Sequence, residues 1–148
     1  QSEYDGTTTT KTEQWTPTLG FGINDSYDWL QLRAYRIDVE DEANVYDGGY
    51  NSLEGKYTHW YEESDNHQLE FVQFSILSGK RLLAIDSDAA VIYSTTDMQT
   101  GSLTLSAQWR LSTRSKFLLL GNYGQFKNEA LNDEYQSLLF YINLQQQW

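Results

Sequence analysis

The chain has 148 residues, enough for one domain with its own core. Ten Lys and Arg residues stand against 21 Asp and Glu, which gives a formal net charge of −11. This acidity argues against a nucleic-acid binder, which needs a basic surface, and against an electrostatic partner of anionic lipid. Cysteine is absent, which excludes disulfides, thiolate metal sites and a cysteine nucleophile.

The spacing of the hydrophobic residues has a period of two almost throughout, which predicts strands. Proline occurs once, at Pro17, and few prolines suit a chain made of hydrogen-bonded strands. Aromatic residues make up 15% of the chain, and tyrosine and tryptophan are frequent both on sheet surfaces and at membrane interfaces. No apolar run reaches about 18 residues, so no transmembrane helix is expected.

The domain organisation predicted is a polar N-terminal tail over 1–12 and a single β-barrel domain over 13–148. The first two strands are expected at about 13–24 and 27–39. The second changes phase along its length, because apolar residues lie first on one face and then on the other. A β-bulge near Ala34–Tyr35 would reconcile the two halves.

Three further strands are expected at about 52–63, 67–77 and 81–95. An acidic, glycine-containing connection over 40–51 precedes the first of them. The Ser78–Gly79–Lys80 sequence, which lies between the second and the third, predicts a tight turn.

The last three strands are expected at about 102–112, 116–127 and 135–148, after a turn at 97–101. The strand at 102–112 has the clearest alternation in the chain. Its apolar face consists of Leu103, Leu105, Ala107, Trp109 and Leu111. The strand at 135–148 also alternates, and it ends in an aromatic residue.

Eight strands joined in succession predict an all-β fold, an eight-stranded antiparallel up-and-down barrel, because closure removes two long unpaired edges. An even number of strands would put both chain ends on one side, together with the connection over 40–51. Aromatic residues near strand ends are expected at a membrane interface, notably Trp15, Trp29 and Trp109. Strands of this length can cross a bilayer, so the apolar face is expected to point outward.

The sequence at 135–148, YQSLLFYINLQQQW, resembles the C-terminal strand of bacterial outer-membrane β-barrel proteins. The residues that carry the resemblance are Leu138, Phe140, Ile142, Leu144 and Trp148. Gln146 departs from the usual alternation. The resemblance implies a transmembrane β-barrel in the outer membrane of a Gram-negative cell envelope. It also implies contact with outer-membrane lipid and recognition of the last strand, as an assembly signal, by the barrel-assembly machinery.

One group of charged residues is expected in the lumen. If the strands at 81–95 and 102–112 pair through the turn at 97–101, Asp88 lies opposite Arg110, with Asp86 nearby on the polar face. A pair of this kind would be a gate or a selectivity element, or a structural plug. The plug is favoured, because eight strands leave room only for side chains or one small ligand, and buried charges must pair.

Catalytic residues, cofactors and metals are not expected. His59 and His67 are the only histidines, and no G-x-S-x-G motif is present. We interpret both histidines as solvent-exposed residues near turns. The two histidines lack the spacing of a zinc site, and the acidic stretch over 38–47 lacks the order of an EF-hand.

The function expected is non-enzymatic: a structural or interaction barrel, a subunit of an envelope or transport assembly with a protein partner, or a narrow porin-like pore. Two alternatives stay open, namely an outer-membrane lipid-modifying enzyme and a soluble secreted β-barrel that binds an apolar ligand. A further alternative is that the chain is part of a larger barrel or of a multi-chain assembly.

Overall fold

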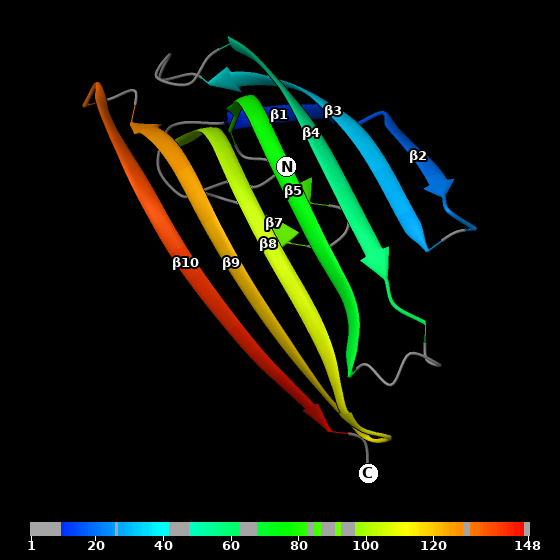
Figure 1. Ribbon diagram of the computed structural model, residues 1–148. Coiled ribbons are helices and arrows are strands. Elements are labelled where there is room, and N and C mark those ends of the chain that lie inside the picture. Colours follow the sequence, from blue (N-terminus) through cyan, green and yellow to red (C-terminus); the bar gives the residue numbers. More distant parts are fainter. Residues whose placement is uncertain are drawn as a thin grey trace.

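The computed structural model describes residues 10–25, 27–41, 48–62, 68–82, 85–86, 91–92, 97–128 and 131–146. Most of them belong to one antiparallel sheet (Figure 1). Its strands are β1 (Thr10–Trp15), β2 (Thr18–Ile23), β3 (Asp28–Asp41), β4 (Gly48–Trp60), β5 (Leu69–Arg81), β8 (Met98–Ser112), β9 (Ser115–Asn128) and β10 (Asp133–Gln146). A separate small sheet consists of β6 (Ile85–Asp86) and β7 (Val91–Ile92). Within the described ranges, no helix is long and apolar enough to cross a membrane.

The strand order in the main sheet is β1–β3–β4–β5–β8–β9–β10, and β2 also pairs with β3. All pairings are antiparallel between strands that follow one another along the sheet, which confirms the predicted all-β, up-and-down antiparallel fold of eight strands. The sheet is not closed: among the described residues, β10 pairs only with β9, and β1 and β2 pair only with β3.

The predicted strand at 13–24 is present, but it is broken at Thr16–Pro17. Trp15 pairs with Arg36 and Thr18 pairs with Arg33, so β1 and β2 keep one continuous register along β3. The break follows from the proline, which has no amide hydrogen for the ladder. Since β1 and β2 share one position, the eight strands fill seven positions across the sheet. The strand also begins at Thr10, inside the predicted tail.

The strand ends define two ends of the sheet. At end A, β3, β5 and β9 end and β1, β4, β8 and β10 begin; at end B, β2, β4, β8 and β10 end and β3, β5 and β9 begin. β1 begins at end A, whereas β10 finishes at end B. The prediction that both chain ends lie on one side, together with the connection over 40–51, is therefore wrong, because the sheet is an odd number of positions wide.

The bulge predicted at Ala34–Tyr35 is absent, because β3 pairs without interruption with β4, and on its other side the register is kept across the break at Thr16–Pro17. The change of phase has another cause. Toward end A the inner face of β3 becomes apolar, and Ile37 and Val39 pack there with Leu82 and Met98 in a small buried core.

The predicted strand at 81–95 is not a strand of the main sheet. β5 continues through the expected turn at Ser78–Gly79–Lys80 and pairs directly with β8. The expected turn at 97–101 is likewise part of β8. Gly79 explains how the chain passes the first site, since its φ is +107° and a Cβ there would lie 2.5 Å from the carbonyl oxygen of Asn51.

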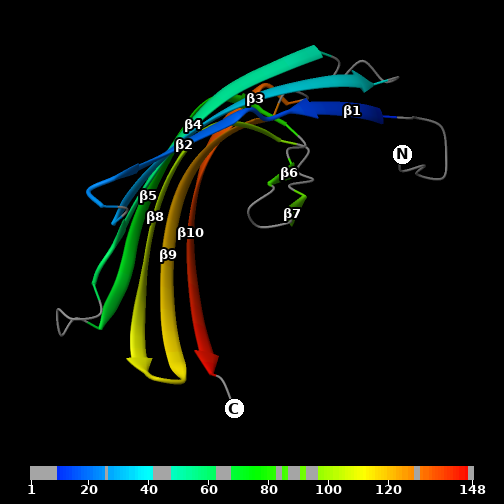
Figure 2. The ribbon, with the colours of Figure 1, turned by 90° about the vertical axis from the view of Figure 1, so that its right-hand side faces the viewer.

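The sheet is strongly curved, with β6 and β7 beneath its concave side (Figure 2). The face of Ile37 and Val39 is the concave face, because Leu82 and Met98, which flank the β6–β7 segment, pack against it. The opposite face is convex. This separation of two faces determines where the candidate functional surfaces lie.

Candidate functional site

The convex face carries a continuous apolar surface across the whole sheet. Cross-strand partners share a face, and one line of partners crosses all seven positions. This line consists of Leu19, Leu32, Gly55, Ile76, Leu103, Tyr123 and Leu138. Apolar or aromatic side chains from six of the seven positions therefore meet on this line, and the β4 position on it is Gly55.

The large apolar side chains of this surface are exposed rather than covered. We call them the apolar field, which comprises Leu19, Phe21, Ile23, Leu32, Leu53, Tyr57, Phe74, Ile76, Leu103, Leu105, Leu119, Leu138, Phe140, Ile142 and Leu144. Phe140 is 70% exposed and Leu138 is 66% exposed. Soluble monomers rarely expose connected apolar patches larger than a few hundred Å². The apolar field is thus a surface that requires an apolar neighbour.

Charged residues on the convex face form ion pairs toward end A, and Asp28 lies beside His59 at end B. Toward end A, Arg36 Nη2 lies 2.7 Å from Asp38 Oδ1, and Lys11 Nζ lies 3.1 Å from Glu13 Oε1. The Arg36–Asp38 pair is about half-exposed, and the Lys11–Glu13 pair is more exposed. The cross-strand partners of these four residues do not belong to the apolar field. The convex face therefore changes from polar at end A to apolar toward end B.

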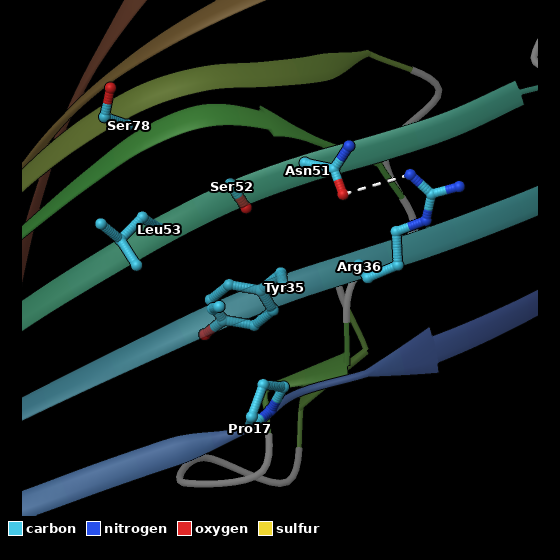
Figure 3. A pocket seen from close by; sticks show the side chains of 8 residues that line it. Pro17, Tyr35, Arg36, Asn51, Ser52, Leu53 and Ser78 are labelled. Atoms are coloured by element: carbon cyan, nitrogen blue, oxygen red, sulfur yellow. Dashed lines mark hydrogen bonds between the residues drawn. The ribbon is translucent and has the colours of Figure 1, made fainter.

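A shallow hollow lies at the border between these two regions, where Pro17 interrupts the first strand position. Its volume is about 440 Å³, and the small side chain of Ala34 forms part of its lining together with Leu53. At its polar side, Arg36 Nη1 donates a hydrogen bond to Asn51 Oδ1 at 3.3 Å (Figure 3). The hollow is open and mixed in character, and nothing about it indicates catalysis.

The concave face carries a buried polar network near its centre. Arg33, whose side chain is only 5% exposed, donates through Nε to Thr18 Oγ1 at 3.1 Å and through Nη1 to the Tyr35 hydroxyl at 3.3 Å. The Tyr35 hydroxyl donates to Glu54 Oε2 at 2.7 Å, and Arg33 Nη1 lies 3.8 Å from the same oxygen. The carboxylate balances the guanidinium charge, as a buried cation requires.

A second polar cluster lies on the concave side near end B, around Glu70. Its carboxylate accepts hydrogen bonds from Gln108 Nε2 at 2.6 Å and from Arg110 Nε at 2.8 Å, and Lys116 Nζ lies at 3.1 Å. Two cationic side chains and one amide therefore share a single carboxylate on the concave side.

The predicted lumen charge group is only partly within the described residues. Arg110 lies on the concave face, and it contacts Glu70. Asp88 lies outside the described residues, and of Asp86 only the backbone, in β6, is described. Because β8 lies between β5 and β9, the strand register that motivated an Asp88–Arg110 pair does not form.

The three predicted interface tryptophans divide between the faces. Trp15 is exposed on the convex face, and Trp109 lies on the same face with its ring 5.5 Å from that of Phe117. Trp29 lies on the concave face, where its ring covers Gly20 so closely that a Cβ there would clash at 2.2 Å. The convex face therefore includes Trp15 and Trp109 but not Trp29.

In the last strand, the alternating row lies where the sequence suggested. Leu138, Phe140, Ile142 and Leu144 are exposed on the convex face of β10. Trp148, the aromatic residue that completes the resemblance, lies outside the described residues. The row therefore forms one end of the apolar field, at an unpaired edge of the sheet.

His59 is held by Asp28 at the end-B margin of the apolar field. Its Nδ1 lies 2.5 Å from Asp28 Oδ1, the Tyr57 hydroxyl donates to the same oxygen at 2.6 Å, and Tyr61 packs edge-on against the imidazole. His67 lies outside the described residues. No group of three or more potential metal ligands occurs in the part of the chain that the structure describes.

A comparison with protein-family models, a search of curated proteins and a search of solved structures each gave no match. The function must therefore be argued from the two faces of the sheet and the side chains on them.

Proposed function

We propose that this sheet is the wall of a β-barrel in a bacterial outer membrane. Its convex face would contact the lipid hydrocarbon, and its concave face would line a narrow polar lumen. The role proposed is structural or interactive, as a subunit of an envelope assembly or as a narrow pore, and not enzymatic.

The observation that carries this proposal is the inverted distribution of polarity. The apolar field is exposed on the convex face, whereas the ion pair of Arg33 and Glu54 is buried on the concave face. Exposing one large apolar side chain to water costs about 1.5 to 3 kcal/mol, and lipid removes that cost. A soluble carrier that binds an apolar ligand would need the opposite arrangement, with its apolar residues inside.

Strand lengths fit the same proposal. β5 has 13 residues and β10 has 14, and a tilted strand of about 9–11 residues crosses the hydrocarbon core. Transmembrane barrels alternate apolar and polar residues along each strand, which explains a mean hydropathy as low as −0.62.

The connections support one orientation in the membrane. Outer-membrane barrels have short periplasmic turns and longer external loops. The longest connection, between β5 and β8, begins and ends at end A, and the tightest turn, 113–114, lies at end B, where the eight-residue connection between β4 and β5 also begins and ends. We therefore place end B, where β10 finishes, in the periplasm. This orientation puts the acidic connection 42–47 outside.

Membrane fractionation tests the proposal. The chain should remain in the outer-membrane fraction after extraction with alkaline carbonate, and it should require detergent to stay monodisperse. A chain that is monodisperse without detergent would contradict a lipid-facing apolar field and would favour the soluble alternative.

A lipid-modifying enzyme is the second candidate, because Asp28 holds His59 at the margin of the apolar field. An Asp–His pair of this kind can orient a general base. The described contacts of His59 are with Asp28 and Tyr61 and include no serine. Replacing His59 and His67 by Gln should leave the phospholipid and lipid A species of the host unchanged. A changed lipid profile would establish the enzyme.

A further inference from the structure

The concave face is polar at its centre but becomes apolar on β9 and β10. Two rows of cross-strand partners cross it from β4 to β10: Thr58, Gln73, Ser106, Leu120 and Tyr141 in one row, and Lys56, Ser75, Thr104, Asn122 and Leu139 in the other. The members on β4, β5 and β8 are all polar. On β9 and β10, every member except Asn122 is apolar or aromatic. This part of the sheet is thus apolar on its lumen side as well as on its lipid side.

We call Leu118, Leu120, Leu139 and Tyr141 the concave apolar strip. Leu118 precedes Leu120 on the same face of β9, and Leu120 lies directly across from Tyr141 and diagonally across from Leu139, so the four side chains are neighbours. Leu139 is 54% exposed and Tyr141 is 46% exposed. No member of the strip belongs to the small buried core near end A. The strip therefore requires an apolar occupant of its own, on the side of the sheet opposite to the lipid.

A cation lies at the end-B end of this strip. Lys116, Leu118 and Leu120 follow one another on the concave side of β9, since every second residue of a strand shares a face. Lys116 Nζ lies 3.1 Å from Glu70 Oε2, and its side chain is 44% exposed. Because an ammonium group has three donors, Lys116 can bind a further acceptor beside Glu70. Gln145 lies directly across from Lys116 on β10 and adds an amide to this position.

The order of these groups matches an amphiphile with one alkyl chain and a carboxylate head. Glu70 shows that the end-B rim already holds a carboxylate, through Lys116 and Arg110. A ligand carboxylate at Lys116 would gain a charge-assisted hydrogen bond there, whereas a cationic head would be repelled. From Lys116 to the level of Leu139 the path along β9 is roughly 20 Å, at about 3.3 Å per residue. A path of this length accommodates a long alkyl chain.

We propose that the lumen side of β9 and β10 binds a long-chain fatty acid. Its carboxylate would lie at Lys116 near end B, and its alkyl chain would lie on the concave apolar strip. This inference rests on the proposed function, in which end B faces the periplasm, and it gives the lumen of that barrel a ligand that reaches it from the periplasmic side.

Photolabelling tests the site in the full chain, reconstituted in phospholipid vesicles. The probe is palmitate with a diazirine in its alkyl chain, and mass spectrometry at residue resolution separates the two faces of β10. Labelling of Leu139 should saturate at low probe content, and excess palmitate should displace it. Labelling of Leu138 and Phe140, on the convex face, should rise in proportion to the probe in the bilayer without displacement. Hexadecyltrimethylammonium, which has the same alkyl length and a cationic head, should not displace the label from Leu139.

Two pairs of variants locate the head and the chain of the fatty acid. Lys116→Gln should lower the saturable labelling of Leu139 about tenfold, because it removes the charge that holds the carboxylate. Its control, Arg114→Gln, removes an exposed cation of the neighbouring turn and should leave the labelling unchanged. Leu120→Gln places an amide in the path of the alkyl chain and should also lower the labelling. Its control is Ser137→Gln, at the next concave position of β10 beyond the strip.

Three results would overturn the inference. Absent or unsaturable labelling of Leu139 would show that no fatty acid occupies the strip, as when another protein segment covers it. Equal displacement by palmitate and by hexadecyltrimethylammonium, or equal effects of Lys116→Gln and Arg114→Gln, would show that the site does not select an anion. The convex residues keep failure of the proposed function separate. If Leu138 and Phe140 are labelled while Leu139 is not, only the fatty-acid site is wrong; if Leu139 alone is labelled, the site stands and the lipid-facing wall is wrong.

Discussion

Arg33 keeps its guanidinium almost fully buried on the concave face, and Glu54 supplies the balancing charge. We expect Glu54→Leu to lower the free energy of unfolding by about 3 kcal/mol, because it leaves a buried cation without its carboxylate. Urea unfolding in lipid vesicles measures this loss. The matched control is Asp38→Asn, which removes the half-exposed partner of Arg36 and should cost about 1 kcal/mol or less. Equal losses would contradict the burial of the Arg33 network.

Glu70 is the shared partner of Gln108, Arg110 and Lys116 on the concave side. Glu70→Gln removes the negative charge between two cations and should lower the free energy of unfolding by about 1 to 2 kcal/mol. Urea unfolding in lipid vesicles measures this loss. An unchanged free energy of unfolding would show that the two cations do not depend on the carboxylate.

Sequence reasoning identified some of these residues but not their partners. Arg110 was expected to pair with Asp88, yet the carboxylate beside it comes from Glu70 at the start of β5. That contact depends on which strand lies beside β8, a long-range choice that alternation in the sequence cannot reveal. Likewise, tryptophan is a residue type that is frequent at membrane interfaces, but the alternation of side chains along β3 places the ring of Trp29 over Gly20 on the concave face.

At the scale of the strand, β10 offers neighbouring positions on opposite faces. Ile142 belongs to the apolar field, and Asn143 lies on the concave face. Ile142→Arg should lower the free energy of unfolding in lipid by about 2 to 4 kcal/mol, because arginine would face hydrocarbon. Asn143→Arg, at nearly the same depth, should cost much less. Equal effects, measured by urea unfolding in the same vesicles, would mean that β10 does not present one face to lipid.

The strands that sequence reasoning located well are those with strict alternation. The strand at 116–127 is β9 with one residue added at each end, and the strand at 102–112 is the later part of β8. The failures have physical causes. Gly79, at positive φ, lets β5 continue through Ser78–Gly79–Lys80, a sequence typical of tight turns. The apolar residues over 81–95 have a period of two, as a strand of the main sheet also would.

The whole molecule differs from a soluble β-protein in the face of the sheet that is covered. The small buried core lies under the concave face near end A, while the apolar field remains exposed across every position of the sheet. Alternation in the sequence predicts two such faces, but it does not predict the curvature that makes the apolar one convex. Alternation also does not predict that the number of positions is odd, or that both edges run in the same direction. Both features depend on β1 and β2 sharing a position and on 81–95 not joining the main sheet.

The central claim is that the convex face contacts lipid hydrocarbon. Fluorescence of variants that retain one tryptophan, in vesicles of lipids brominated on the acyl chains, tests it most directly. Trp109, on the convex face, should be strongly quenched, whereas Trp29, which lies over Gly20 on the concave face, should be quenched weakly. Equal quenching of the two, or stronger quenching of Trp29, would contradict the account.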